Sequence, residues 1–217
     1  MRREYPAVLY RGALAALVSV TLAGAAAATT VQNADPVDAI WKVQHLPFEY
    51  RSSETFYSCD SLRQKVRAIL LVAGAHPSLN ITARCVSGVS NHIVAQIAVT
   101  TAVAATPENI AAATHFDTKD ELIARLHRTQ LPDASSIPHF TASWRDQSLS
   151  AIHDVRITLA DCELLHDLEE QILSHIDVHI VQKRPGCSRL TAEAGFASMG
   201  RPNIRLRALI PVPDARL

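Results

Sequence analysis

The sequence predicts an α+β fold in which two disulfide-stapled βαββ pseudo-repeats pack as one domain with a mixed sheet. Cys59 and Cys85 are 26 residues apart, and Cys162 and Cys187 are 25 residues apart. Each first cysteine opens an amphipathic stretch (CDSLRQKVRAILL, CELLHDLEEQIL), and each second one closes a β-branched stretch. An apolar N-terminal segment indicates that the chain is exported. Disulfides persist in the oxidising environment outside the cytosol.

The first 28 residues have the pattern of a signal peptide. Basic residues at Arg2, Arg3 and Arg11 precede GALAALVSVTLAGAAAA, which carries no charge and ends in small residues at Ala28. This run is shorter than the roughly 20 apolar residues of a spanning helix and is mostly alanine. We therefore expect cleavage near Ala28, no membrane span after it, and a flexible leader over residues 29–39.

The first pseudo-repeat is predicted over about residues 40–104. Aromatic residues in WKVQHLPFEYRSSETFY favour a strand interrupted by a Ser-Ser-Glu turn. Ser58 is the expected N-cap of a helix from Cys59 to Ala73, which Gly74 ends. Strands over residues 79–84 and 92–104 complete the unit.

The second pseudo-repeat is predicted over about residues 140–212 and matches the first by position. Asp161 is expected to cap the second helix as Ser58 caps the first, and Leu165 occupies the position of Leu62. A returning strand that contains Val178 and Ile180 follows, and then a third strand over residues 203–212. In each unit the strand before the helix is expected to run parallel to the strand after it, in a right-handed crossover.

A linker over residues 105–139 joins the two units. Thr118 and Glu121 fit a capping box ahead of Leu122, Ile123 and Leu126, and this pattern predicts one short helix that Pro132 stops. The expected domain therefore spans residues 40–217.

Element lengths allow each cysteine pair to close a disulfide. A helix from Cys59 to Ala73 rises about 22 Å, and a strand from Leu79 to Cys85 returns about 23 Å. The two ends meet, and the same holds for the second unit. We predict the pairs Cys59–Cys85 and Cys162–Cys187.

Composition narrows the classes of function. Beyond residue 28 the chain keeps 18 basic and 20 acidic residues, and aromatics make up 5% of the whole. This balance argues against a nucleic-acid partner, which needs a clustered basic surface. Motifs of the types G-x-S-x-G and H-E-x-x-H and glycine-rich phosphate loops do not occur in the sequence, so no catalytic residue and no cofactor is predicted.

The cysteines and a group of histidines offer two chemical alternatives. Cys59 and Cys162 each begin a predicted helix, where a thiolate is stabilised, but redox pairs usually have the spacing C-x-x-C. His166, Glu170, His175 and His179 could be drawn as a metal site, yet their spacing does not bring them to one point. We predict structural disulfides and solvated histidines, with no metal.

Five segments resemble a family of uncharacterised, signal-peptide-bearing proteobacterial proteins with no assigned activity. The segments are FEYRSSETFYSCD, GAHPSLNI, TASWRDQSL, DCELLHDLEEQIL and NIRLRALIPV, and the similarity extends from Trp41 to Pro211. The resemblance implies an exported protein and transfers no catalytic residue.

We expect a periplasmic or secreted, non-enzymatic binding or envelope-interaction protein that acts through its sheet surface or its linker, with another envelope protein as partner. The alternative is a periplasmic enzyme or thiol oxidoreductase.

Overall fold

Six strands form one antiparallel sheet, and two helices pack on one side of it. The computed structural model describes residues 35–85, 88–149, 152, 154–183 and 204–213, all of which belong to the compact unit Asn33–Leu217. The strand order is β3-β5-β1-β6-β8-β7. The strands are β1 (Val37–Arg51), β3 (Asn80–Arg84), β5 (His92–Ala104), β6 (His139–Ser148), β7 (Val178–Lys183) and β8 (Ile204–Pro211). A small second sheet pairs β2 (Tyr57–Ser58) with β4 (Val89–Ser90).

The predicted mixed sheet is wrong for the described pairings, which are all antiparallel. β1 and β3, on either side of the first helix, do run in the same direction, but β5 lies between them. In the same way β8 lies between β6 and β7. In each unit the third strand therefore lies between the first and the second and pairs antiparallel with both, whereas the prediction placed the first two strands in parallel.

Helix α1 (Cys59–Val72) forms as the local signals predict. The Ser58 side chain accepts a hydrogen bond from the Ser61 N–H at 3.2 Å, which confirms the N-cap. Gly74 follows the helix with a φ of 89°, a left-handed conformation that glycine adopts without a Cβ clash. A Cβ at this position would lie 2.9 Å from Cδ1 of Ile210 on β8. Gly74 is thus required both by the turn and by close packing.

The second helix is less regular than predicted. A 3₁₀ turn, η2 (Leu159–Asp161), precedes α4 (Cys162–Leu168), and a π-helical turn, η3 (Glu169–Leu173), follows it. The prediction that the Asp161 side chain caps this helix is wrong. Its carboxylate turns back to Thr158, accepting from the N–H at 2.7 Å and from Oγ1 at 3.0 Å. Tyr57 and Lys65 also donate to it there, which favours this position over the helix start.

The linker contains two helices instead of the predicted one. α2 (Pro107–Ala113) begins with proline after an N-cap at Thr106, and α3 (Thr118–His127) follows. The capping box of α3 is made by Asp117 and Asp120, not by Thr118 and Glu121. The box lies one residue earlier than predicted because Asp117 can serve as N-cap in the same way as threonine. β1 also begins earlier than expected, at Val37, inside the predicted leader.

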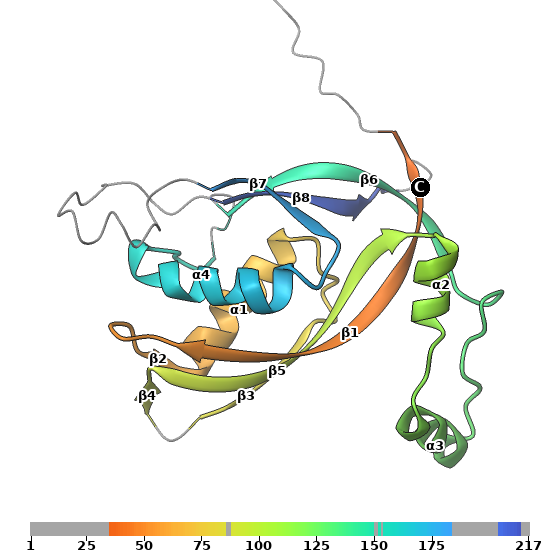
Figure 1. The fold of residues 1–217 in the computed structure, drawn as a ribbon, viewed down its shortest axis with the longest axis horizontal. Coiled ribbons are helices and arrows are strands. Elements are labelled where there is room, and N and C mark those ends of the chain that lie inside the picture. Colours follow the sequence, from red (N-terminus) through yellow and green to blue (C-terminus); the bar gives the residue numbers. More distant parts are fainter. Residues whose placement is uncertain (1–34, 86–87, 150–151, 153, 184–203, 214–217) are drawn as a thin grey trace, which may run out of the picture. The chain divides into compact units, whose positions relative to one another are not determined.

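The core lies between the two halves of the sheet. β1 and β6 pair only over residues 37–40, and beyond this point the halves separate, with α1 and α4 between them (Figure 1). Both helices turn one apolar face inward, toward buried residues of the strands. The largest fully buried side chains are Tyr50, Phe48, Ile40, Leu62, Ile69, Leu70, Ile93, Ile97, Leu164, Leu168, Ile172 and Leu206. None of the described helices is long and apolar enough to cross a membrane.

One of the two predicted disulfides is seen. Cys59 and Cys85 are bonded, with their Cα atoms 5.9 Å apart, which ties the start of α1 to the end of β3. Cys162 is also disulfide-bonded. Its predicted partner Cys187 lies outside the described residues, so this pairing stays a prediction. The predicted signal peptide lies outside them as well.

Candidate functional site

The face of β3, β5 and β1 that points away from the helices is open to solvent. Burial alternates along β5, where Ile93 and Ile97 are buried and Val94 is exposed. On β1, Val43 is exposed as well. Their exposed fractions, 59% for Val43 and 43% for Val94, are high for valines in the interior of strands.

We call this surface the outer face. Residues paired across neighbouring strands share a face, and the register places Val94 beside both Glu49 and Arg84. The outer face consists of Thr82 and Arg84 of β3, His92, Val94, Gln96 and Ala98 of β5, and Val43, His45, Pro47, Glu49 and Arg51 of β1.

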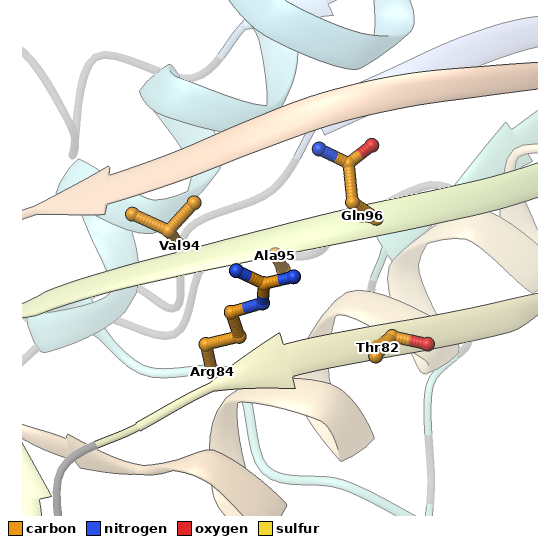
Figure 2. Close-up of a pocket in the computed structure, with 5 residues that line it drawn as sticks. All are labelled: Thr82, Arg84, Val94, Ala95 and Gln96. Atoms are coloured by element: carbon orange, nitrogen blue, oxygen red, sulfur yellow. The ribbon is translucent and has the colours of Figure 1, made fainter.

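A shallow depression on the outer face lies between β3 and β5. It is lined by Thr82, Arg84, Val94, Ala95 and Gln96 (Figure 2). The guanidinium of Arg84 extends toward β5, between Val94 and Gln96 (Figure 2). Arg84 has no hydrogen-bonding or ion-pair partner among the described residues. Its charge is therefore available to an anionic group, and the aliphatic side chain of Val94 lies next to it.

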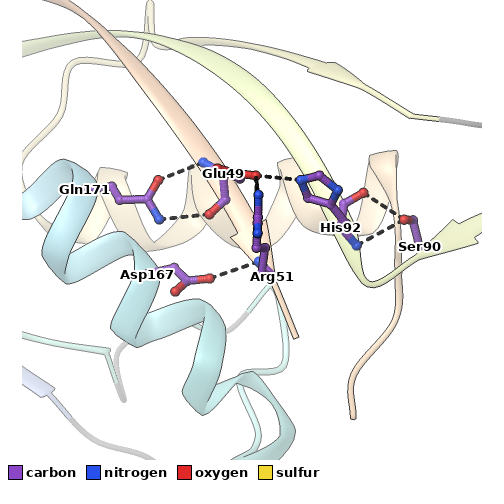
Figure 3. A network of polar contacts seen from close by, with 6 residues as sticks. All are labelled: Glu49, Arg51, Ser90, His92, Asp167 and Gln171. Carbon is purple, nitrogen blue, oxygen red and sulfur yellow. Dashed lines mark hydrogen bonds and ion pairs between the residues drawn. The ribbon is translucent and has the colours of Figure 1, made fainter. Parts of the chain in front are cut away.

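A charged cluster bounds the outer face at one end. Oε1 of Glu49 lies 2.6 Å from Nη2 of Arg51 and 2.6 Å from Nε2 of His92 (Figure 3). Hydrogen bonds from Arg51 and then from His92 hold the pKa of Glu49 below its usual value. The Ser90 hydroxyl fixes the turn before β5, because it donates to the His92 carbonyl at 2.7 Å and accepts from the His92 N–H at 3.1 Å.

The second helix holds this end of β1 in place. Beyond residue 40 the edge of β1 that faces away from β5 has no strand partner in the described chain, and its backbone groups bond to side chains instead. Oε1 of Gln171 accepts from the Glu49 N–H at 2.8 Å, and Nε2 of Gln171 donates to the Glu49 carbonyl at 2.8 Å (Figure 3). Asp167 accepts from the Arg51 N–H at 3.2 Å. Burial raises the pKa of Asp167 more than this hydrogen bond lowers it.

Aromatic side chains gather at the other end of the outer face. The ring centroid of Trp41 lies 5.0 Å from that of His76 and 4.8 Å from that of Phe140. Farther along the sheet, Trp144 lies 5.2 Å from His179. These partly buried rings cover the small residues Ala39, Ala102 and Ala142 and Leu209. Both tryptophans of the protein thus lie on one side of the sheet. Tryptophan is enriched in protein interfaces, so this side is suited to recognition.

A second polar cluster is buried between the two halves. Asp161 is fully buried and accepts from Tyr57 and from Nζ of Lys65, the latter at 2.8 Å. Beside it, the Ser52 hydroxyl donates to Glu163. Burial raises the pKa of Tyr57, and the hydrogen bond to Asp161 raises it further, so its hydroxyl stays protonated. Because Asp161 is closed off from solvent and its acceptors are occupied, the cluster joins the halves and offers little to a ligand.

The cysteine and histidine residues that could carry chemistry lie in separate contacts in the described part of the chain. Cys59 is oxidised, in the disulfide with Cys85. His166 and Glu170 form an exposed contact at 3.2 Å, whereas the ring of His179 packs against Trp144. His175 uses its backbone carbonyl to accept from Gln44 at 2.9 Å. The four residues therefore do not converge, and the described part of the chain has no cluster of three metal-ligating side chains.

Sequence reasoning missed the residues of the outer face. The signal was present in the alternation of β5 and of β1, where a valine stands at a position that the inward pattern assigns to solvent. The contact between Gln171 and β1 had no such signal, because it joins residues 122 apart. Comparison of the chain with family models, curated proteins and solved structures found no match.

Proposed function

We propose that this protein is an exported, non-enzymatic binding protein of the cell envelope, which engages its partner through the outer face. The observation that carries the proposal is the pair of exposed valines, Val43 and Val94, in strands whose other face is buried. Exposed apolar side chains set among polar groups, with aromatic residues nearby, are typical of a protein-binding surface. The outer face has this form: Val43 and Val94 lie among polar residues such as His45 and Gln96, with the Glu49 cluster at one end and the aromatic residues at the other.

The chemistry of the outer face favours a protein partner with an aliphatic side chain next to a carboxylate. Val94 offers apolar contact, and the unpaired Arg84 guanidinium offers a bidentate partner for the carboxylate. The other nearby cation, Arg51, already pairs with Glu49. A peptide carboxylate at Arg84 therefore does not compete with an internal acid.

Export is supported by the cysteines and by the N-terminal pattern. The Cys59–Cys85 disulfide is typical of proteins outside the cytosol. Together with the signal-peptide pattern of residues 1–28, it favours a periplasmic or secreted protein. We also retain the resemblance to an uncharacterised exported proteobacterial family as part of this proposal.

We further infer that the domain arose by duplication of a βαββ unit. Two observations support this inference. Each half follows the order strand, helix, edge strand, inner strand along the chain, and the sheet order β3-β5-β1 of the first half reappears reversed as β6-β8-β7 in the second. Each helix begins at a cysteine, Cys59 in α1 and Cys162 in α4.

Site-specific photo-crosslinking in the envelope tests the outer face. A photoreactive residue at Val94 is expected to capture a discrete partner, and the same residue at Val89 is not. Val89 is the matched control, because it is also an exposed valine, at 66%, but lies on β4 of the other sheet. Arg84→Glu should abolish capture at Val94. Equal capture at both positions, or capture that is unaffected by Arg84→Glu, would contradict the proposal.

A thiol oxidoreductase remains the second candidate, because Cys59 is the first residue of α1. On reduction its thiolate would be stabilised by the free N–H groups of the first helical turn. Brief treatment with a mild dithiol followed by alkylation distinguishes the two functions. A redox-active pair is reduced and alkylated at a low dithiol concentration, whereas a structural Cys59–Cys85 disulfide needs a far more reducing one, because structural disulfides have low reduction potentials.

A further inference from the structure

Strand β3 leaves one edge of the six-stranded sheet open. It lies at one end of the strand order, and among the described strands it pairs only with β5, in a regular antiparallel register. β7 forms the opposite edge, but its register shifts between Ile180 and Gln182, and such an irregularity protects an edge from further pairing. The open edge of β1 bonds to side chains of the second helix. In the described part of the chain β3 has neither protection.

The register shows which backbone groups of β3 face this open edge. His76, which precedes β3 on the same side of β5, donates its N–H to the Thr100 carbonyl at 2.8 Å. The backbone of Thr100 therefore points toward β3, and in antiparallel strands this direction alternates from residue to residue. Even-numbered residues of β5 thus bond to β3, and their partners in β3 are also even-numbered. The N–H and C=O groups of Ile81 and Ala83 face the open edge, where no described residue bonds to them.

Two exposed arginines flank the open edge. The guanidinium of Arg67, on α1, donates to the Leu79 carbonyl at 2.7 Å and to the Pro77 carbonyl at 2.8 Å, at the start of β3. Arg84 ends β3 and has no hydrogen-bonding or ion-pair partner among the described residues. Neither β3 nor β5 contains aspartate or glutamate. The charges beside the edge therefore favour an acidic partner.

We propose that an extended acidic segment of a partner protein adds to the open edge of β3 as a further antiparallel strand. Its backbone bonds to the N–H and C=O groups of Ile81 and Ala83, whose alternating directions only an extended chain can match. A carboxylate opposite Arg84 pairs with its guanidinium, which turns outward from its position over β5 (Figure 2). A second carboxylate, opposite Leu79, reaches Arg67. The inference rests on the proposed function for the class of occupant, which is a partner protein.

Amide hydrogen exchange of the full-length protein tests this geometry residue by residue. The probe is the synthetic peptide acetyl-EVTVTE-amide, whose glutamates would lie opposite Arg84 and Leu79 in the antiparallel register. At about ten times its Kd, the peptide should slow exchange of the Ile81 and Ala83 amides about tenfold, by the factor 1 + [L]/Kd. The Thr82 amide is the matched control, because it already bonds to β5 and should be protected without peptide. Unchanged exchange at Ile81 and Ala83 would overturn the proposal.

Variants of the peptide and of the protein separate backbone pairing from charge. A peptide with N-methyl groups on both valines lacks the donors that face the edge and should not bind. Lysine in place of both glutamates should weaken binding about tenfold, and Arg84→Glu should weaken binding of the original peptide. Equal binding of the N-methylated or the lysine peptide would overturn the proposal. So would protection of Ile81 and Ala83 that rises with protein concentration in the absence of peptide, because a second copy would then occupy the edge.

Photo-crosslinking at Val94 distinguishes this inference from the proposed function. Ala83→Pro removes a donor from the open edge and leaves the side chains of the outer face in place, since proline is tolerated where the strand N–H faces outward. Its melting temperature checks the fold, and capture at Val94 should be lost. Capture that persists in a folded Ala83→Pro variant would overturn the inference alone. If the wild type captures nothing at Val94 but the peptide protects Ile81, the proposed function fails and the edge site stands.

Discussion

Replacing Asp161 by asparagine should be among the most destabilising polar substitutions in this protein. Asparagine has the size of aspartate but lacks the charge, so the effect reports electrostatics and not packing. The substitution leaves the Lys65 ammonium, whose side chain is only 14% exposed, without its carboxylate. It also weakens the hydrogen bonds that Asp161 accepts from Tyr57 and from the Thr158 N–H.

The magnitude follows from burial. Removing one member of a buried ion pair costs about 3–5 kcal/mol, because the remaining charge stays desolvated. Lys65 retains a hydrogen bond to the Arg156 carbonyl at 2.8 Å and some access to water, so we expect the lower end, about 3 kcal/mol. In a chain of this size such a loss lowers the melting temperature by about 6–12 °C.

Urea unfolding at neutral pH measures this cost, with Asp60→Asn as the matched control. Asp60 pairs with Arg63 at 2.5 Å, but both side chains are exposed, at 74% and 51%. Such a surface pair contributes about 0–1 kcal/mol. If Asp161→Asn costs no more than Asp60→Asn, the buried cluster does not hold the two halves together and the reasoning fails.

The pH dependence of the same comparison has a definite sign. Burial alone would raise the pKa of Asp161, but hydrogen bonds from Lys65, Tyr57 and the Thr158 N–H together lower it below 3.8. A lowered pKa in the folded state means that the ionised form stabilises the fold. The difference in stability between wild type and Asp161→Asn should therefore be complete above about pH 5 and shrink as the pH falls below about 4.

Three further substitutions test local features of the fold by thermal or urea unfolding. Gln171→Leu should cost about 1–2 kcal/mol, because the partly buried backbone groups of Glu49 lose both partners. Gly74→Ala should cost more than about 1 kcal/mol, since it combines a φ of 89° with a contact of 2.9 Å to Ile210. Thr101→Val should stabilise by about 1 kcal/mol, because the buried Thr101 hydroxyl has no hydrogen-bond partner among the described residues.

A matched control for each substitution isolates the contact that the substitution changes. Glu170→Leu lies beside Gln171 on an exposed position and should cost little. Gly88→Ala shares a positive φ, 97°, but its Cβ would meet no atom within 4 Å, so it measures the backbone strain alone. Thr100→Val lies on the opposite side of β5 and should not stabilise. If Gly74→Ala costs no more than Gly88→Ala, the close approach to Ile210 has no energetic weight.

The elements that the sequence predicts well are those with local signals at both ends. The helix α1 was expected between Ser58 and Gly74 because the N-cap and the left-handed C-terminal residue are read from single positions. The strand β5 was expected over residues 92–104 because its apolar alternation is uninterrupted. In α2, PENIAAA has no amphipathic face, and only its Thr-Pro start could have indicated a helix.

Strand pairing and buried polar partners could not be predicted in the same way. Nothing in the local pattern says whether β3 or β5 lies beside β1, because that choice depends on contacts between residues far apart in the chain. Asp161 shows the same limit. At a helix start an aspartate can cap the helix or turn away to a buried lysine, and here Lys65 is 96 residues distant. The choice is made by tertiary packing.

The open edge of β1 determines both how the helices are enclosed and how Glu49 is held. If β1 and β6 were paired along their whole length, the two halves would form one flat sheet, and α1 and α4 would have only one layer of strands to pack on. Because pairing stops at Ile40, the halves separate and enclose the helices, and the free backbone groups of β1 need other partners. Gln171 supplies them from η3, which fixes the position of Glu49. The charged end of the outer face therefore depends on a side chain of the second half, and Gln171→Leu should weaken partner capture at Val94 as well as stability.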